Sequence, residues 1–110
     1  MPNYQNKVNG LLGLAARAGK IICGTDAVKE AILKKKVYIV ILAEDSSLNT
    51  REKFLKLSNE NKIKIFIHGN IDENSRAIGK KNKAVIGVKD KNFSEAIAGI
   101  INGGDAIGQN

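Results

Sequence analysis

Residues 37–42, VYIVIL, form a continuous apolar run that is dominated by β-branched side chains. A run of this length without alternating polar residues is typical of a strand that is buried on both faces. Such a strand lies inside a sheet whose two sides are covered by helices. The run therefore predicts an α/β protein with residues 37–42 at the centre of its sheet.

Helix-like and strand-like segments alternate outward from this run in both directions. The alternation predicts a three-layer α/β/α sandwich with a four-stranded, largely parallel or mixed sheet. The expected elements besides residues 37–42 are a helix at 8–18 ending at Gly19, a strand at 20–23, a helix capped by Gly24 or Thr25, a helix capped by Ser46 or Ser47, a strand at 63–67, a helix at 72–78, a strand at 84–88 and a helix at 93–101.

The length of 110 residues and the hydrophobic content of 43% suit one core, so we expect a single domain at residues 1–103 and a flexible tail at 104–110. No apolar run approaches the roughly twenty residues of a membrane helix. The N-terminal residues lack the order of a secretory signal. We therefore expect a cytoplasmic monomer without membrane association, in which the single cysteine, Cys23, forms no disulfide.

The net charge of +7 favours a polyanionic partner. Residues 1–36 carry seven Lys or Arg against two acids, and residues 76–91 carry six against one, so each block has a balance of +5. Two basic blocks that are distant in sequence suggest that the fold brings them together on one surface, as a nucleic-acid-binding protein requires.

The residues present do not support a P-loop, a nucleophile with its base, or a metal site. The segment GLAARAGK, residues 13–20, has five residues between its glycines and Ile21 after its lysine, whereas a phosphate-binding P-loop needs four and a Ser or Thr. Cys23 and His68 both lie in apolar segments, which indicates core packing rather than a nucleophile with its base. One Cys and one His cannot supply a metal site. We therefore expect no enzyme, metal or cofactor.

Two segments are better candidates for contact with RNA. The helix start at Gly24, Thr25 and Asp26 offers free backbone amides next to Arg17 and Lys20. The turn that contains Lys80, Lys81 and Lys83 leads into the last expected strand. Most of the five aromatic residues occupy core-periodic positions, so a sheet that stacks bases on exposed aromatics is not expected.

These segments resemble a known family. The stretches LLGLAARAGKIICGTDAVKEAI, YIVILAEDSSLNTREKF and AIGKKNKAVIGVKDKNFSEAI occur in the order found in the ribosomal protein superfamily of kink-turn RNA binders, of the L-seven-Ae and L-thirty-e type. The resemblance covers roughly residues 8–101, and the bacterial YlxQ-like branch is the most similar. It implies an α/β/α sandwich that binds RNA without catalysis.

The resemblance also implies a site. In the family, the N-terminus of the second helix enters the widened major groove of a bent helix–bulge–helix RNA, and a loop before the last strand covers an extruded base. The family's helix start falls here at Gly24, Thr25, Asp26 and Ala27, and its covering loop at residues 80–85. The implied RNA-binding residues are Arg17, Lys20, Lys29, Lys80, Lys81 and Lys83 for positive charge, Gly24 and Thr25 for amides, Asp26 for a base edge, and Ala84 and Val85 for apolar contact with a base.

The chain departs from the family pattern at several positions. Asp26 stands in place of an asparagine, Ala27 in place of a glutamate and Glu30 in place of a lysine, while Asn74-Ser75 replaces Leu-Gly. Asp26 can accept a hydrogen bond from a guanine edge but cannot donate one, and its charge opposes nearby phosphates. This residue either changes the RNA specificity or lowers the affinity.

The sequence also leaves a different class of function open. A protein-interaction module could use the same scaffold to dock on a ribonucleoprotein or an acidic partner with little direct RNA contact. Weak RNA binding that ignores a kink would favour this alternative over binding of ribosomal or other structured RNA.

Overall fold

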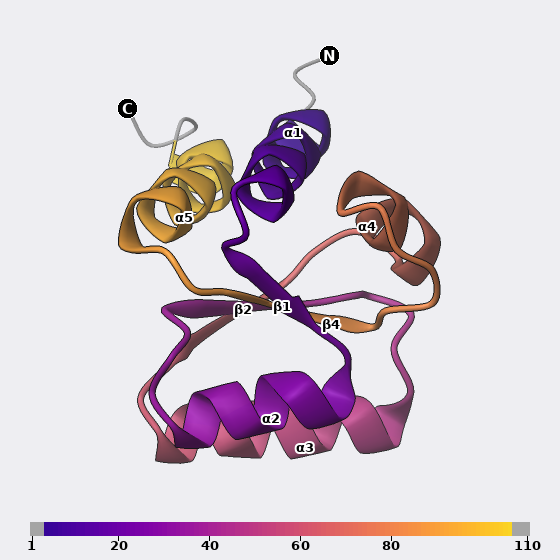
Figure 1. Ribbon diagram of the computed structural model, residues 1–110, viewed down its shortest axis with the longest axis vertical. Coiled ribbons are helices and arrows are strands. Elements are labelled where there is room, and N and C mark those ends of the chain that lie inside the picture. The colour runs from indigo at the N-terminus through magenta and orange to yellow at the C-terminus, as the bar shows by residue number, and fades with distance from the viewer. Residues whose placement is uncertain (1–3, 107–110) are drawn as a thin grey trace.

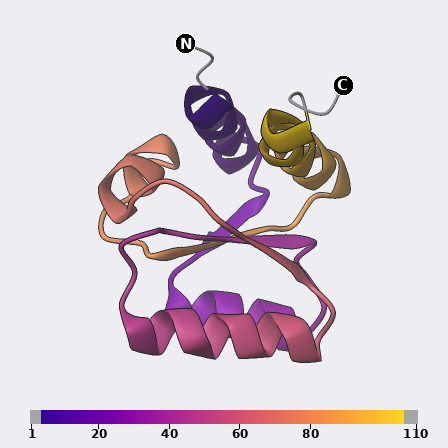
Figure 2. The ribbon, with the colours of Figure 1, turned by 180° about the vertical axis from the view of Figure 1, so that it is seen from behind.

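The computed structural model describes residues 4–106, and its helices and strands form the three layers that the sequence predicts (Figure 1). Helices α1, α4 and α5 cover one face of the sheet, and α2 and α3 cover the other (Figure 1; seen from behind in Figure 2). The elements are α1 Tyr4–Arg17, β1 Ile21–Cys23, α2 Thr25–Leu33, β2 Ile39–Leu42, α3 Leu48–Glu60, β3 Lys64–Ile67, α4 Ile71–Ala77, β4 Val85–Val88 and α5 Lys91–Ala106.

The sheet is mixed, with the strand order β1-β4-β2-β3. Strand β2 runs parallel to β3 and antiparallel to β4, and β1 runs antiparallel to β4. The apolar run at residues 37–42 supplies β2, which lies between two other strands, so its predicted central position is confirmed. The strand begins only at Ile39, and Tyr38 is 52% exposed, so the predicted burial on both faces applies to residues 39–42 and not to the whole run.

Alternate residues of the two inner strands face two separate hydrophobic cores. Ile39, Ile41, Ile86 and Val88 pack with Val8 and Leu12 of α1 and Ile97 of α5. Val40, Leu42 and Val85 pack on the other face with Val28 and Ile32 of α2 and Phe54 of α3. All residues of β2 and β4 are buried, because each strand has helices on both sides.

Gly87 in β4 leaves room for the side chains of Val37 and Ile22, which pack against its backbone. A Cβ atom at this position would lie 2.9 Å from a methyl carbon of Val37, 3.0 Å from one of Ile22 and 3.6 Å from one of Val28. Any larger residue would therefore displace neighbouring core side chains.

The helix boundaries agree with the expectations except at the two ends of the chain. Helix α1 begins at Tyr4 rather than near Val8, and α5 begins at Lys91 and continues to Ala106. Residues 104–106, which we expected in the tail, therefore belong to α5, while residues 107–110 of that tail lie outside the described residues. Within residues 4–106, no helix has the length and apolar character needed to cross a bilayer.

The loops divide into two groups at opposite ends of the sheet. The turn end, on the right in Figure 1, comprises the start of α2, residues 43–47, residues 68–70 and the turn at 79–84. The lysine end, on the left, comprises residues 18–20, 34–38, 61–63 and 89–90. Because β1, β2 and β3 finish at the turn end while β4 starts there, segments far apart in sequence meet at each end.

Candidate functional site

Helix α2 begins at the turn end with unbonded backbone amides. Gly24 is the N-cap, with φ 95° and ψ 152°, and no side chain caps the helix. The Gly24 carbonyl accepts from the Val28 amide at 3.0 Å, so the amides of residues 25–27 have no partner within the helix. Such amides, with the positive end of the helix dipole, form a favourable environment for an anion such as a phosphate.

The lysine-rich turn at residues 79–84 is fixed by the buried side chain of Ser75. The Ser75 hydroxyl accepts from the Lys83 amide at 2.8 Å and donates to the Lys83 carbonyl at 3.3 Å. The Ser75 carbonyl accepts from the Lys80 amide at 2.8 Å. One serine at the end of α4 therefore holds both sides of the turn, while Lys80 and Lys81 remain exposed.

The turn lies directly beside the start of α2. The Gly24 amide donates to the Val85 carbonyl at 3.0 Å, and a Cβ atom on Gly24 would lie 3.8 Å from Nζ of Lys83. The Lys83 ammonium is thus close to the N-cap backbone. The expected proximity of the helix start and the lysine-rich turn is present in the structure.

Arg17 approaches the same region from α1. It lines a depression of 310 Å³ between α1 and α4, together with Gly13, Ala16, Arg76, Ala77, Ile78 and Gly79. Gly79 is the first residue of the lysine-rich turn, so Arg17 borders one end of that turn. Arg76, which the sequence did not single out, contributes a second guanidinium to the depression.

Four other predicted site residues occupy different environments. The Lys20 carbonyl accepts from the Lys89 amide at 2.8 Å, which places Lys20 at the lysine end, about 13 Å along β1 from Gly24. Val85 is fully buried and cannot contact a base. Lys29 is exposed on α2, and Ala84 is half-buried beside Lys83.

The two basic blocks do not form the single surface that we expected. Lys83 of the second block lies near the start of α2, but Lys89 lies beside Lys20 at the lysine end. Each block is divided between the two ends, because a strand carries the chain from one end of the sheet to the other.

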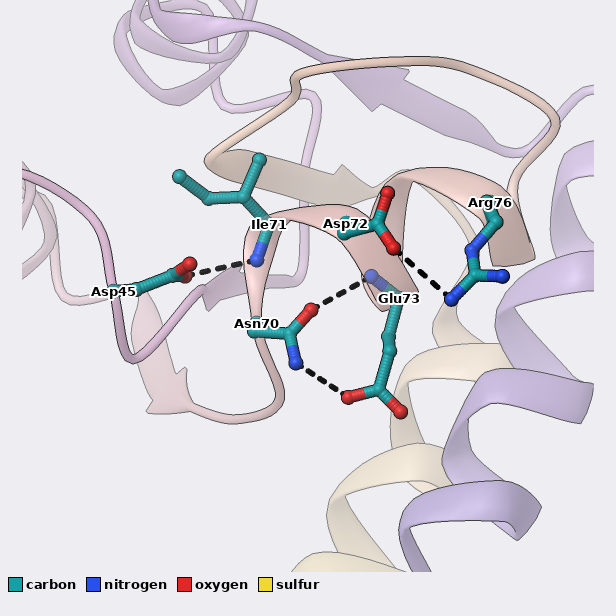
Figure 3. Close-up of polar contacts among 6 residues, drawn as sticks. All are labelled: Asp45, Asn70, Ile71, Asp72, Glu73 and Arg76. Atoms are coloured by element: carbon teal, nitrogen blue, oxygen red, sulfur yellow. Dashed lines mark hydrogen bonds and ion pairs between the residues drawn. The ribbon is translucent and has the colours of Figure 1, made fainter.

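Acidic residues at the turn end have structural partners (Figure 3). Asp45 accepts from the Ile71 amide at 2.8 Å, and Asn70, the N-cap of α4, accepts from the Glu73 amide at the same distance. Asp72 pairs with Arg76 at 3.0 Å. These contacts orient α4 and, through Ser75, the lysine-rich turn.

Cys23 and His68 are too far apart to act as a nucleophile and its base. Cys23 ends β1 and His68 follows β3, and these strands form opposite edges of the sheet, about 14 Å apart across three strand spacings. Burial lowers the pKa of His68, whereas Glu44 and Glu73 act in the opposite direction. Among the residues that the structure describes, no three His, Cys, Asp or Glu side chains are grouped as a metal would require.

Ser75 is the residue of this region whose role the sequence did not indicate. A serine near the end of a short predicted helix is an ordinary feature, and its bonds to Lys83 span eight positions. The spacing of residues carries no signal for such a contact, because it depends on the path of the turn.

Comparisons with known proteins agree with this architecture. Similar chains are the RNA-binding protein YlxQ of Enterococcus faecium, 36% identical over 92% of this chain and 96% of that protein, and YlxQ of Bacillus subtilis strain 168, 33% identical over 83% and 91%. A solved protein of unknown function from Bacillus halodurans C has 40% identity and a TM-score of 0.85, over 87% of this chain and 97% of its own.

The fold also occurs at lower identity. The Giardia lamblia 15.5kD RNA binding protein superposes with a TM-score of 0.80 at 15% identity, covering 96% of this chain and 91% of its own. The model of the ribosomal protein L7Ae/L30e/S12e/Gadd45 family matches residues 6–98. The chain therefore belongs to the ribosomal protein L7Ae/L30e/S12e/Gadd45 family.

Proposed function

We propose that this protein binds structured RNA without catalysis, and that its turn end recognises kink-turn-like helix–bulge–helix elements. The observation that carries the proposal is the position of the Lys83 ammonium beside the N-cap of α2, where free amides and a cation face one region. The names of the two YlxQ relatives support RNA as the partner.

The proposed contacts follow from the chemistry of the turn end. Lys80, Lys81 and Lys83 neutralise phosphates, with Arg17 and Lys29 at the margins. The amides following Gly24 approach a phosphate or base edge closely, because the N-cap has no side chain. Asp26 accepts from a guanine edge, and Ala84 provides apolar contact with an unstacked base.

The proposed setting is a cytoplasmic monomer bound to ribosomal RNA or another ribonucleoprotein RNA. The family name refers to ribosomal proteins, which supports this setting. Sedimentation of the protein with ribosomal particles tests the association, and its molar mass in solution tests the monomer.

A titration that compares three RNAs at one ionic strength tests the central proposal. The RNAs are a kink-turn, the same strands with the bulge replaced by paired bases, and a plain duplex. The proposal predicts preferential binding of the kink-turn. Equal and weak binding of all three would favour the alternative, in which the scaffold docks on a protein of a ribonucleoprotein.

Charge reversal locates the interface. Changing Lys80 and Lys81 together to Glu abolishes kink-turn binding without unfolding the protein, because both side chains are exposed. The matched control changes Lys53 and Lys56 of α3, which are also exposed, to Glu. Equal losses in the two variants would indicate an effect of net charge alone and would remove the turn from the interface.

A further inference from the structure

A second group of lysines lies at the lysine end, away from the proposed kink-turn surface. Ile21, Val88, Ile39 and Lys64 form one row across the sheet. Lys20 immediately precedes β1 and Lys89 immediately follows β4, and the Lys89 amide donates a hydrogen bond of 2.8 Å to the Lys20 carbonyl. The exposed lysines of this end and its borders are Lys20, Lys34, Lys35, Lys36, Lys62, Lys64, Lys89 and Lys91.

Few acidic groups offset this charge. Glu30 pairs with Lys34 at 2.6 Å, and Asp90 accepts from the Phe93 amide at 2.8 Å. Glu60 is exposed near the end of α3. Lys36 also interacts electrostatically with Glu30, whereas Lys20 and Lys89 form no ion pair within the described residues. The lysine end therefore presents more unneutralised positive charge than the turn end, where several acids accompany the lysines.

Two of these lysines occupy backbone positions that favour glycine. Helices α1 and α4 end with Gly19 and Gly79 at positive φ, whereas α2 and α3 end with Lys35 and Lys62, both at φ 57°. The hydrogen bonds are equivalent, since Lys36 donates to Ala31 and Ile63 donates to Ser58, as Lys20 donates to Ala15. The left-handed conformation is strained for a lysine but not for a glycine. At both positions the sequence therefore places a cation at the lysine end, although glycine would end the helix with less backbone strain.

We propose that the lysine end is a second RNA-binding surface, which holds the phosphate backbone of a duplex segment separate from the RNA at the turn end. The row across four strands spans about 14 Å, and a double helix presents several phosphates over such a distance. Backbone contacts of this kind carry no sequence information. The protein thereby joins two RNA segments, one recognised by shape at the turn end and one held by charge.

The two surfaces act independently. Strand β1 alone separates Lys20 from Gly24 by about 13 Å, which exceeds the screening length of about 8 Å at physiological salt. Loss of one surface therefore leaves the affinity of the other largely unchanged.

Three triple variants of equal net charge test the proposal by titration with a straight RNA duplex. The lysine-end variant changes Lys36, Lys64 and Lys89 to Gln; the turn-end variant changes Lys80, Lys81 and Lys83; the control changes Lys7, Lys53 and Lys56. All nine side chains are exposed or half-buried. At physiological ionic strength the lysine-end variant loses about tenfold or more in duplex affinity. Its slope of log affinity against log salt falls by about 2 to 3, from three lost phosphate contacts.

The turn-end and control variants keep duplex binding near that of the unmodified protein. Equal losses in all three variants overturn the proposal, because they indicate attraction by net charge alone. Binding to vesicles of anionic phospholipid without binding to the duplex also overturns it, because the partner is then a membrane. Thermal unfolding of each variant shows whether it remains folded, and single substitutions at Lys36 and Lys89 replace any triple variant that does not.

A capture experiment tests the joining of two RNAs. Immobilised kink-turn RNA is loaded with protein, and a labelled straight duplex is added. The unmodified protein retains the duplex, and the lysine-end variant retains about tenfold less duplex while still occupying the kink-turn. Equal retention by both proteins overturns the proposal. If the protein does not occupy the immobilised kink-turn, the proposed function fails, and the duplex titration still decides the role of the lysine end.

Discussion

At the scale of single residues, Asp26 is the group in the first turn of α2 whose charge opposes an anionic ligand. Its side chain is exposed, and the neighbouring amides have no partner within the helix. The carboxylate stabilises α2 through its favourable interaction with the helix dipole, but it repels a phosphate that approaches the same amides. Helix stability and RNA affinity therefore make opposite demands on this position.

Asp26→Asn is expected to raise kink-turn affinity by about tenfold, because it removes a negative charge and adds an amide donor. The same change lowers the stability of the protein by a few tenths of a kcal/mol through the helix dipole. Titration with kink-turn RNA and with a duplex measures the affinity and the specificity. Glu95→Gln on α5 is the control, and an equal gain there would assign the effect to net charge.

His68 gives the protein a defined response to pH. The side chain is 5% exposed, its Nε2 atom has no hydrogen-bond partner, and burial lowers its pKa. In the unfolded chain the histidine has a pKa near 6.5, whereas in the folded chain its pKa is lower. As the pH falls, the unfolded chain therefore binds a proton before the folded chain does. The stability contributed by the neutral form is therefore complete above this pKa and decreases as the pH falls below it.

We expect the free energy of unfolding to decrease from pH 7 to pH 5, and to decrease much less in His68→Gln. This histidine is the only one in the sequence, and unperturbed carboxylates titrate mostly below this range. Urea unfolding at a series of pH values measures the difference. Parallel pH profiles for the two proteins would mean that another group controls acid stability.

At the scale of elements, the four helix ends that lead into loops share one hydrogen-bond pattern but differ in sequence. Gly19 and Gly79 follow α1 and α4, whereas Lys35 and Lys62 follow α2 and α3. The pattern was predictable at the glycines, which are the usual residues in this conformation. It was not predictable at the lysines, because packing of the helix and the following strand imposes it.

Lys62→Gly is expected to stabilise the protein by about 1 kcal/mol and to raise its melting temperature by about 4 °C, because glycine adopts a positive φ without strain. Gly19→Ala is the reciprocal change and destabilises the protein by a similar amount. Thermal unfolding of both variants tests the argument. A less stable Lys62→Gly variant would show that the lysine side chain makes a larger contribution to the fold than its backbone costs.

At the scale of the whole molecule, charge is distributed over two ends of one sheet. The net charge of +7 describes neither end, because acids near α4 offset the lysine-rich turn while the lysine end has few acids. A polyanion therefore encounters two surfaces that differ in net positive charge. The ionic strength of the solution decides how much each surface contributes to the binding affinity.

Binding of a short kink-turn RNA is expected to weaken with salt, with a slope of log affinity against log salt of about −3 to −4 for roughly four phosphate contacts. Longer RNA helices on either side of the kink are expected to steepen this slope only if the RNA then reaches the lysine end of the protein. Titrations over a range of salt concentrations measure both slopes. A flat response would contradict binding by phosphate neutralisation.

The sequence by itself indicated the type and order of the elements and most of the buried apolar positions, because the periodicity of apolar side chains is a local property of each segment. Residues 37–42 indicated a central strand, and Gly24 and Ser47 occupy expected helix starts. The proximity of the α2 start and the lysine-rich turn was expected from the family resemblance. Only the tertiary structure decided the strand order and directions, since strand pairing joins residues distant in the chain. That pairing fixes which lysines share an end, and it separates Lys20 from Gly24 and buries Val85.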